Sequence, residues 1–317
     1  MEDLQRSDVR CWWCFGQGSP PHSQPLQVGA GIPGVELQLW LSWMVPCKRG
    51  SVSDYETRFA GIARLYGANG LAHIRASHVC VVGIGGVGSW TVEALARSGV
   101  GRLTLIDLDE VCVSNMNRQL HAIDGSIGRS KVEVMAGRVR GINPDCQVVA
   151  VPEFFTSETA GRLIASKFNF VVDAIDTLRN KCLLIASCRE REIPLMVCGG
   201  AGGRRDGTMV RMADLAQATH DRLLQKVREI LRKEHGFPRG DRKFGVECVF
   251  STEPPVFPNK EGLICASPAS DDDQEQPGPV RLNCDWGLGS AAFVTGAFGL
   301  AAAGQVVRKL AERSSPG

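Results

Sequence analysis

The chain has 317 residues, and its contents of 44% hydrophobic and 22% charged residues are ordinary for a soluble globular protein. This length allows a substantial core in one or two domains. The net charge of +2 excludes a polycation, so any contact with nucleic acid has to be a local patch. Twelve cysteines, several of them inside apolar runs, occur without a secretory signal, which predicts reduced thiols and a cytoplasmic protein.

Residues 1–52 differ from the rest of the chain. A Cys11-Trp-Trp-Cys14 pair is followed by a run rich in Pro, Gly, Ser and Gln, and then by an apolar run too short to span a bilayer. The cysteine pair lacks a second pair of ligands, which counts against a zinc site. We expect residues 1–52 to form a poorly ordered extension and residues 53–317 to form the folded domain.

A glycine-rich stretch lies between an apolar run and a segment with helical periodicity. The apolar run Val79–Val82 predicts a buried strand, and the turn after it contains Gly83, Gly85, Gly86 and Gly88. A strand, a glycine turn and a helix N-terminus form an anion site, because the first helical N–H groups have no partner in the helix. Asp107 ends the next apolar run about 20 residues further on, where an acid that binds ribose hydroxyls belongs.

Strand-like and helix-like segments alternate along much of the domain. The expected strands are 78–82, 103–107, 147–151, 170–173 and 194–198. Helical periodicity separates them, as in residues 131–142, which end at Asn143-Pro144. This order predicts an α/β fold with a doubly wound, largely parallel, Rossmann-like sheet and a C-terminal α-rich extension. Ligands of such sheets bind at the carboxyl ends of the strands.

Polar residues that a nicotinamide enzyme does not need follow the ribose-binding acid. Two amides and two fixed positive charges come shortly after it, in Asn115, Arg118, Gln119 and Lys131. Phosphoryl or adenylyl transfer needs such groups, because negative charge builds on phosphate oxygens in the transition state. Mg²⁺ prefers one or two carboxylates plus phosphate oxygens, which makes Asp176 the expected metal ligand. A nicotinamide oxidoreductase and a non-catalytic nucleotide-binding scaffold remain the alternatives from other classes.

Taken together, these motifs resemble those of the adenylating domain shared by ubiquitin-activating enzymes and the ThiF/MoeB adenylyltransferases. Within that superfamily the chain is most similar to the tRNA threonylcarbamoyladenosine dehydratases. The motifs that carry this likeness are Arg58–Gly67, Gly83–Gly88, Ile106–Asp109, Val111–Gln119, Asp173–Asp176, Gly199–Gly203 and Gly245–Glu253. The likeness extends from about residue 54 to about residue 312.

The resemblance implies a homodimeric enzyme that uses ATP and Mg²⁺ to dehydrate N6-threonylcarbamoyladenosine beside the anticodon of tRNA. Adenylation of the threonyl carboxylate would be followed by ring closure. It implies that the four glycines bind phosphate with Asp109 nearby, that Asp107 holds the ribose and that Asp176 positions Mg²⁺. It further implies that Arg118 and Lys131 neutralise the triphosphate, and that Asn115 and Gln119 orient it. An arginine of the partner subunit would reach the γ-phosphate, and Arg58 and Arg64 are both candidates.

Other relatives activate a sulfur-carrier or ubiquitin-like protein, which is the alternative function. The sulfur-carrier branch binds zinc through two Cys-x-x-Cys pairs, and residues 53–317 contain none. Relatives that transfer an acyl group to sulfur use a thiol. Cys248 is the candidate here, although a buried structural cysteine is the more common case.

Two segments near the C-terminus, residues 221–243 and 287–307, have helical periodicity or apolar composition. A basic amphipathic stretch, residues 221–243, predicts a solvated helix face, and the resemblance makes it a contact for tRNA phosphates. The candidate residues for that contact are Arg204, Arg205, Lys226, Arg232 and Lys233. Residues 287–307 are apolar, but glycines and Gln305 favour a packed helix in the core or at a dimer interface over a membrane span. Membrane association and, in a eukaryote, a mitochondrial location are the alternatives to the cytoplasm.

Overall fold

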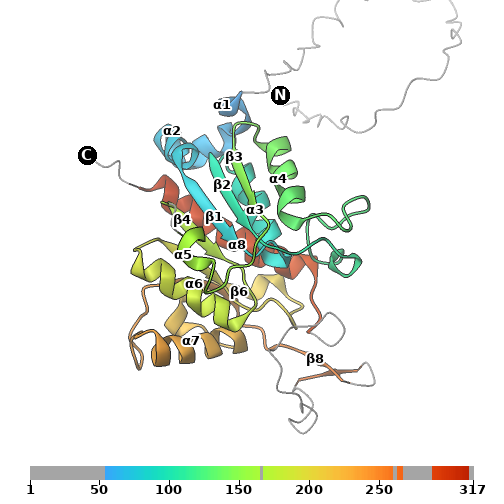
Figure 1. Cartoon of the computed structure of the whole chain (residues 1–317), viewed down its shortest axis with the longest axis vertical. Coiled ribbons are helices and arrows are strands. Elements are labelled where there is room, and N and C mark those ends of the chain that lie inside the picture. Colours follow the sequence, from blue (N-terminus) through green and yellow to red (C-terminus); the bar gives the residue numbers. More distant parts are fainter. Residues whose placement is uncertain (1–53, 165–166, 260–262, 267–287, 314–317) are drawn as a thin grey trace, which may run out of the picture. The chain divides into compact units, whose positions relative to one another are not determined.

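The computed structural model describes residues 54–164, 167–259, 263–266 and 288–313 (Figure 1). All of them belong to the compact unit Gly50–Gly317. The expected N-terminal extension, residues 1–52, lies outside the described residues, so its boundary with the folded domain remains a prediction.

A seven-stranded sheet with the order β3-β2-β1-β4-β5-β7-β6 forms the centre of the fold. Its strands are β1 (His78–Val82), β2 (Arg102–Ile106), β3 (Gln147–Val151), β4 (Phe170–Asp173), β5 (Leu195–Cys198), β6 (Val210–Asp214) and β7 (Glu247–Ser251). Every pairing is parallel except that of β6 with β7. The strand order reverses between β1 and β4, which is where ligands bind in doubly wound sheets. The predicted fold class is confirmed, and β6 and β7 add two strands that the alternation did not reveal. A separate hairpin pairs β8 (Phe257–Pro258) with β9 (Ile264–Cys265).

Helices cover both faces of the sheet (Figure 1). They are α1 (Tyr55–Arg58), α2 (Ala60–Ala76), α3 (Gly86–Arg97), α4 (Lys131–Ile142), α5 (Ala160–Leu163), α6 (Leu178–Glu190), α7 (Arg222–Glu234) and α8 (Ala292–Ala311). One core cluster joins α2, α3, α4 and α8 to Val79 and Val81, and others join α5, α6 and α7 to the opposite face, where Cys80 and Val82 point. Alternate residues of β1 thus point to opposite faces and both are buried, as expected for a strand covered on two sides.

The C-terminal helix α8 packs unusually close to α3. A Cβ atom at Gly299 would lie 2.5 Å from the carbonyl oxygen of Val87 and 2.8 Å from the Cβ of Trp90. The side chain of Thr91 also reaches the carbonyl of Gly299, at 3.3 Å. Only glycine allows this approach, so the prediction of a tightly packed helix is confirmed. Among the described helices, none is long and apolar enough to cross a membrane.

The basic stretch forms a shorter helix than its composition indicated. Helix α7 ends at Glu234, and Gly236 follows with a φ of 64°. This left-handed conformation stops a helix at little cost only in glycine. The bases between residues 239 and 243 therefore lie in a loop and not on the helix face.

Two glycines of α8 give a matched test of the helix packing. We expect Gly299→Ala to lower the free energy of unfolding by about 2 kcal/mol, because the new methyl group forces α3 and α8 apart. Gly304→Ala should raise it by up to about 1 kcal/mol, because no atom lies within 4 Å of the added Cβ and alanine favours the helix. Urea denaturation of both variants measures the difference. Equal effects of the two substitutions would contradict the close packing at Gly299.

Candidate active site

The turn between β1 and α3 depends on two glycines that the chain itself requires. Gly83 has a φ of 89°, and a Cβ atom there would lie 2.7 Å from the carbonyl oxygen of Ala174. A Cβ atom at Gly88 would overlap the carbonyl oxygen of Gly83. These contacts bring the first turn of α3 onto the end of β1 and fix the loop after β4 beside it.

Gly85 has a different environment. A Cβ atom there would meet only the Nε2 of Gln119, at 3.9 Å, and its φ of −86° suits any residue. Gly85 is the N-cap of α3, and no described side chain accepts from the free N–H groups of that helix end. A small polar space lined by backbone N–H groups is what an anion, such as a phosphate, needs.

Asp107 clamps the turn from the end of the neighbouring strand β2. Its carboxylate accepts hydrogen bonds from the backbone N–H of Ile84 at 2.6 Å and of Asp109 at 2.9 Å. Burial raises the pKa of Asp107, while the charge of Lys131 and these two hydrogen bonds oppose the rise. A carboxylate has about four lone-pair sites, so two remain free for ribose hydroxyls.

Lys131 is held at the start of α4 and points toward the same edge of the sheet. Its Nζ lies 2.8 Å from the Oδ2 of Asp109, and only 7% of the lysine side chain is exposed. Asp109, predicted to bind ATP, therefore acts in this structure by orienting Lys131. The ammonium group retains two further N–H donors for a phosphate.

The segment after the short helix η3 (Val113–Asn115) supplies buried polar groups, one of which the sequence analysis missed. The side chain of Asn115 accepts from the N–H of Cys112, at 3.1 Å, and therefore shapes this segment. The Oε1 of Gln119 is buried and has no partner among the described residues. The same holds for both ring nitrogens of His121. Burial, aided by the charge of Lys131, lowers the pKa of His121 to about 4, so its ring is neutral near pH 7. Its position two residues after Gln119 was the only signal in the sequence.

Arg118 lies beside the glycine turn, and hydrogen bonds accepted by its backbone carbonyl fix its position. That carbonyl accepts from the indole N–H of Trp90 at 3.2 Å and from the hydroxyl of Thr295 at 3.0 Å. The Cγ of Arg118 would lie 3.6 Å from a Cβ at Gly86. Helices α3 and α8 thus hold this arginine at the site.

The loop between β4 and α6 carries Asp176. Lys181 and Asp173 form a fully buried ion pair at 3.0 Å, and Lys181 also donates to the carbonyl of Ile175 at 2.9 Å. The loop contacts Gly83, as described above, and Asp176 follows it with an exposed side chain. No group of three or more His, Cys, Asp or Glu residues in the described part of the chain could hold a metal. A magnesium ion at Asp176 would therefore need ligands from a bound phosphate.

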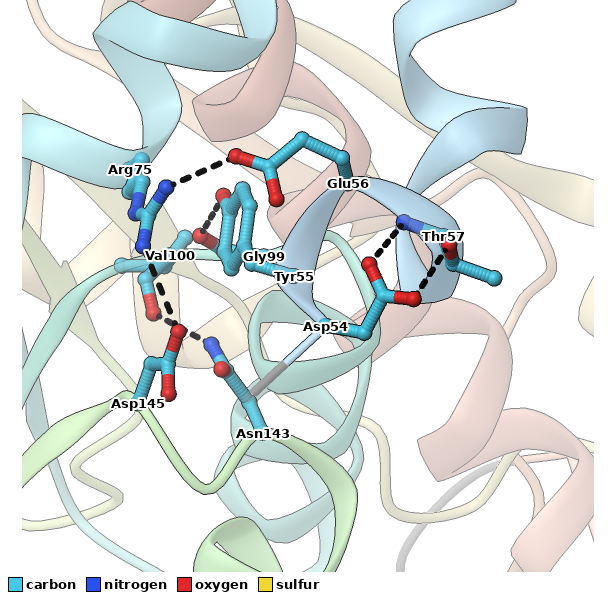
Figure 2. A network of polar contacts seen from close by, with 9 residues as sticks. All are labelled: Asp54, Tyr55, Glu56, Thr57, Arg75, Gly99, Val100, Asn143 and Asp145. Atoms are coloured by element: carbon cyan, nitrogen blue, oxygen red, sulfur yellow. Dashed lines mark hydrogen bonds and ion pairs between the residues drawn. The ribbon is translucent and has the colours of Figure 1, made fainter. Parts of the chain in front are cut away.

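The two candidate arginines of the N-terminal helices are not brought into this site. Arg58 donates to the carbonyl of Ile142 at 3.4 Å, at the far end of α4 from Lys131. Twelve residues of helix separate these ends by roughly 16 Å. Figure 2 shows the surrounding network, in which Arg75 joins Glu56 to Asp145. Arg64 is exposed on α2. Within one protomer, Arg58 therefore lies at the end of α4 away from Lys131.

The candidate thiol does not fit a chemical role. Cys248 lies in β7 with no exposed surface, and burial raises its pKa to about 12. Near neutral pH it is a protonated, inaccessible thiol. Cys248 is therefore a buried structural cysteine, which was the alternative to a reactive thiol.

The residues predicted to contact tRNA fall into two groups. Arg205, Lys226 and Lys233 are exposed. Arg232 is partly engaged, since it donates to the carbonyl of Gly240 at 3.0 Å. Arg204 is only 4% exposed, so it is not a surface contact of the kind that the sequence analysis expected.

The open space at Gly85 gives a direct test of nucleotide binding. We expect Gly85→Ala to leave the thermal unfolding midpoint unchanged and to weaken ATP binding at least about tenfold, because the methyl group occupies the space of the phosphate. Isothermal titration calorimetry with ATP measures the affinity. Gly137→Ala in α4, where no atom lies within 4 Å of the new Cβ, is the control and should bind ATP normally. Unchanged ATP affinity of Gly85→Ala would place the phosphates elsewhere.

Comparison with known proteins agrees with this geometry. The ThiF family pattern matches residues 57–316. The tRNA threonylcarbamoyladenosine dehydratase of Escherichia coli (strain K12) is 45% identical over 266 residues, which are 83% of this chain and 97% of that protein. The enzyme of the same name from Haemophilus influenzae is also 45% identical and 97% covered. A crystal structure of the E. coli enzyme in complex with ATP superposes with a TM-score of 0.71 at 43% identity, covering 82% of this chain and 96% of that one. The chain belongs to the ThiF family.

Proposed function

We propose that this chain is an ATP-dependent tRNA threonylcarbamoyladenosine dehydratase. The observation that carries the proposal is the 45% identity to the E. coli dehydratase over 97% of that enzyme's length. This alignment covers almost the whole length of the E. coli enzyme, so it includes the second half of the sheet as well as the glycine turn. The residues that bind the substrate therefore lie within the aligned region.

The site fits ATP on the chemistry of its free groups. Gly85 leaves room for phosphate oxygens at the start of α3, and the carboxylate of Asp107 has free acceptor sites for ribose. Lys131 and Arg118 flank the turn with positive charge. Asp176 would hold Mg²⁺ together with phosphate oxygens, and that ion would neutralise charge on the departing pyrophosphate.

The proposed reaction has two steps. An oxygen of the threonyl carboxylate attacks the α-phosphorus of ATP, and the bond to the β-phosphate oxygen breaks to give an acyl adenylate and pyrophosphate. The carbamoyl group of the same nucleoside then attacks the activated carbonyl, loses a proton and displaces AMP. The sum is ring closure with net loss of one water from the nucleoside.

The chain's own groups stabilise the first step more than the second. Fixed charges at Lys131 and Arg118 stabilise the negative charge that develops on the phosphate oxygens. The second step is intramolecular, so it gains its rate from the proximity of the two reacting groups and needs no enzyme nucleophile. This agrees with the burial of Cys248.

Two partners follow from the proposal. Exposed Arg205, Lys226 and Lys233 would contact tRNA phosphates. A second copy of the chain would cover the apolar groove of about 320 Å³ along α8, where Phe293 and Leu300 are 65% and 52% exposed. We place the enzyme in the cytoplasm because its proposed substrate is tRNA.

Adenylation of a carrier protein is supported less well. The molybdopterin-synthase adenylyltransferase of E. coli is 34% identical over 146 residues, and the aligned part spans 57% of that protein. This shared segment accounts for nucleotide chemistry and not for the acceptor. A carrier protein would be needed for pyrophosphate exchange under this alternative, and tRNA would have no effect.

The proposed activity is tested by weighing the nucleoside product. The protein is incubated with ATP, Mg²⁺ and either threonylcarbamoylated or unmodified tRNA, and a mass loss of one water is expected only with the modified tRNA. Lys131→Ala and Asp176→Ala should each lower the rate by at least about a hundredfold, because each removes charge stabilisation from the adenylation step. Glu190→Ala, an exposed acid at the other end of α6, is the matched control and should be fully active. A wild-type protein that loads a carrier protein and leaves the tRNA unchanged would overturn the proposal.

A mixing experiment tests the arginine that acts across the dimer. Lys131→Ala and Arg58→Ala are each expected to be inactive alone. Random reassociation of the two should restore about a quarter of wild-type activity, because half of the dimers then contain one intact site. The same mixture is made with Arg64→Ala, and the arginine whose variant complements Lys131→Ala is the one that acts across the dimer. Failure of both mixtures would contradict a shared site.

A further inference from the structure

A second cavity lies on the same edge of the sheet as the glycine turn. It has a volume of about 180 Å³ and is lined by His220, Asp221, Arg222, Gln225, Arg228, Pro254, Pro255, Phe257 and Ala266. Its walls include the residues after β7 and the start of α7. Strands β5 and β7 run parallel to β1, so their carboxyl ends lie on the edge where ligands bind.

Arg204 does not line this cavity but lies behind its wall at His220, as a buried cation with unsatisfied donors. Its Nη2 donates to the carbonyl of His220, a residue of the cavity wall. Its Nε and Nη1 are buried without a partner among the described residues. Burying a guanidinium with free N–H groups costs several kcal/mol unless an acceptor satisfies them.

The nearby carboxylates accept hydrogen bonds from backbone groups, and neither forms an ion pair with Arg204. Asp221 accepts from the N–H of Gly200 at 2.8 Å and of Leu224 at 2.9 Å. Glu253 accepts from the N–H groups of Arg205 and Asp206 at 2.9 and 3.0 Å. Both acids are close enough to favour the charged guanidinium, although burial still lowers the pKa of Arg204.

Two arginines, Arg222 and Arg228, line the cavity itself. The guanidinium of Arg222 lies 4.9 Å above the ring of Phe257, which holds it by a cation–π contact. Arg228 is half-buried, and its hydrogen bond to the carbonyl of Leu215 is long at 3.4 Å. Both guanidinium groups retain donors for an anion.

The backbone of the cavity wall is strained at His220, whose carbonyl accepts from Arg204. His220 has a φ of 56°, which is uncommon for a residue with a side chain and costs of order 1 kcal/mol or more. The turn at His220 delivers the carbonyl that Arg204 binds and places Asp221 as the N-cap of α7. Backbone strain and a buried charge with unpartnered donors therefore occur together beside one cavity.

We propose that this cavity binds a backbone phosphate of the substrate RNA, held by Arg222 and Arg228 in its lining and by the buried Arg204 behind its wall at His220. Guanidinium groups with free donors match a phosphodiester, which accepts hydrogen bonds from planar guanidinium forks. Strands β4 and β5 separate the cavity from the glycine turn. This position suits a nucleotide that flanks the reacting nucleoside. The proposal rests on RNA as the substrate and goes beyond the exposed lysines named above.

Equilibrium binding of RNA without ATP tests this site apart from the chemistry. A fluorescently labelled anticodon stem-loop RNA is titrated with full-length protein at several KCl concentrations. Arg222→Gln and Arg228→Gln should each weaken binding at least about tenfold. Each should also reduce the slope of log Kd against log salt by about 0.7, as expected for one lost phosphate contact on a single strand. Arg102→Gln, an exposed arginine at the opposite edge of the sheet, should change neither quantity.

Arg204→Met separates binding from folding. If the buried charge serves a ligand, this variant should lose RNA affinity and unfold at an equal or higher temperature than the wild type. A lower unfolding temperature with normal RNA affinity would assign Arg204 a structural role and overturn the proposal. Unchanged salt slopes in the Arg222 and Arg228 variants would overturn it too.

Two further outcomes distinguish the sources of phosphate. ATP affinity, measured in the same variants, should stay at the wild-type value, and a parallel loss would assign the cavity to the nucleotide and overturn the proposal. Inorganic phosphate should compete with RNA only weakly, because a free ion lacks the contacts of the rest of the strand. If the wild type binds RNA through this cavity and does not dehydrate it, the proposed function fails and the phosphate site stands.

Discussion

The close approach of Gly88 to the carbonyl of Gly83 is the contact on which the site depends. It fixes the first turn of α3 against the end of β1 and aims that helix end at the edge of the sheet. Gly83 in turn touches the loop after β4, and Asp107 holds the N–H of Ile84 from the end of β2. Three strand ends are thereby tied to one turn of four glycines. The protein's own packing constrains Gly83, Gly86 and Gly88, whereas a Cβ atom at Gly85 would meet only the Nε2 of Gln119, at 3.9 Å.

Buried charges position the groups around this turn. The Lys181–Asp173 pair has no exposed surface, and pairs of this kind contribute little net stability because desolvation offsets their attraction. Its effect is geometric, since Lys181 also binds the loop that leads to Asp176. The ion pair between Lys131 and Asp109 orients the lysine on the other side of the turn. There the side chain of Asp109 is 52% exposed and that of Lys131 only 7% exposed. The effect of these ion pairs is thus to orient charged groups near the turn more than to stabilise the fold.

The sequence predicted the parts of this structure that depend on local spacing. The glycine pattern, the acid after β2 and the alternation of strands and helices are short-range signals, and they predicted the order of the elements and the position of the turn correctly. Strands β6 and β7 were missed because β6 is an edge strand with no fully buried residue, and β7 is separated from β5 by a long segment that includes α7. His121 was missed because its environment is created by Lys131 and burial, neither of which is visible in its neighbours. Arg204 was assigned to the surface because its burial depends on segments after β6 and β7 that lie far away in the sequence.

The two halves of the sheet edge carry different kinds of positive charge. Around β1 and β4, Asp109 anchors Lys131, and the carbonyl of Ser114 and the Oδ1 of Asn117 anchor Arg118, so both cations are held in place before any ligand binds. Around β5 and β7 the nearby acids accept from backbone N–H groups and form no ion pair with Arg204, and the arginines keep free donors. An anchored cation suits catalysis, because charge stabilisation is strongest when the groups need no reorganisation. An unsatisfied cation suits binding, because its full desolvation cost is recovered only when an acceptor enters. Under the two proposals above, one part of this edge would perform the chemistry and the other would hold the RNA on which the chemistry is performed.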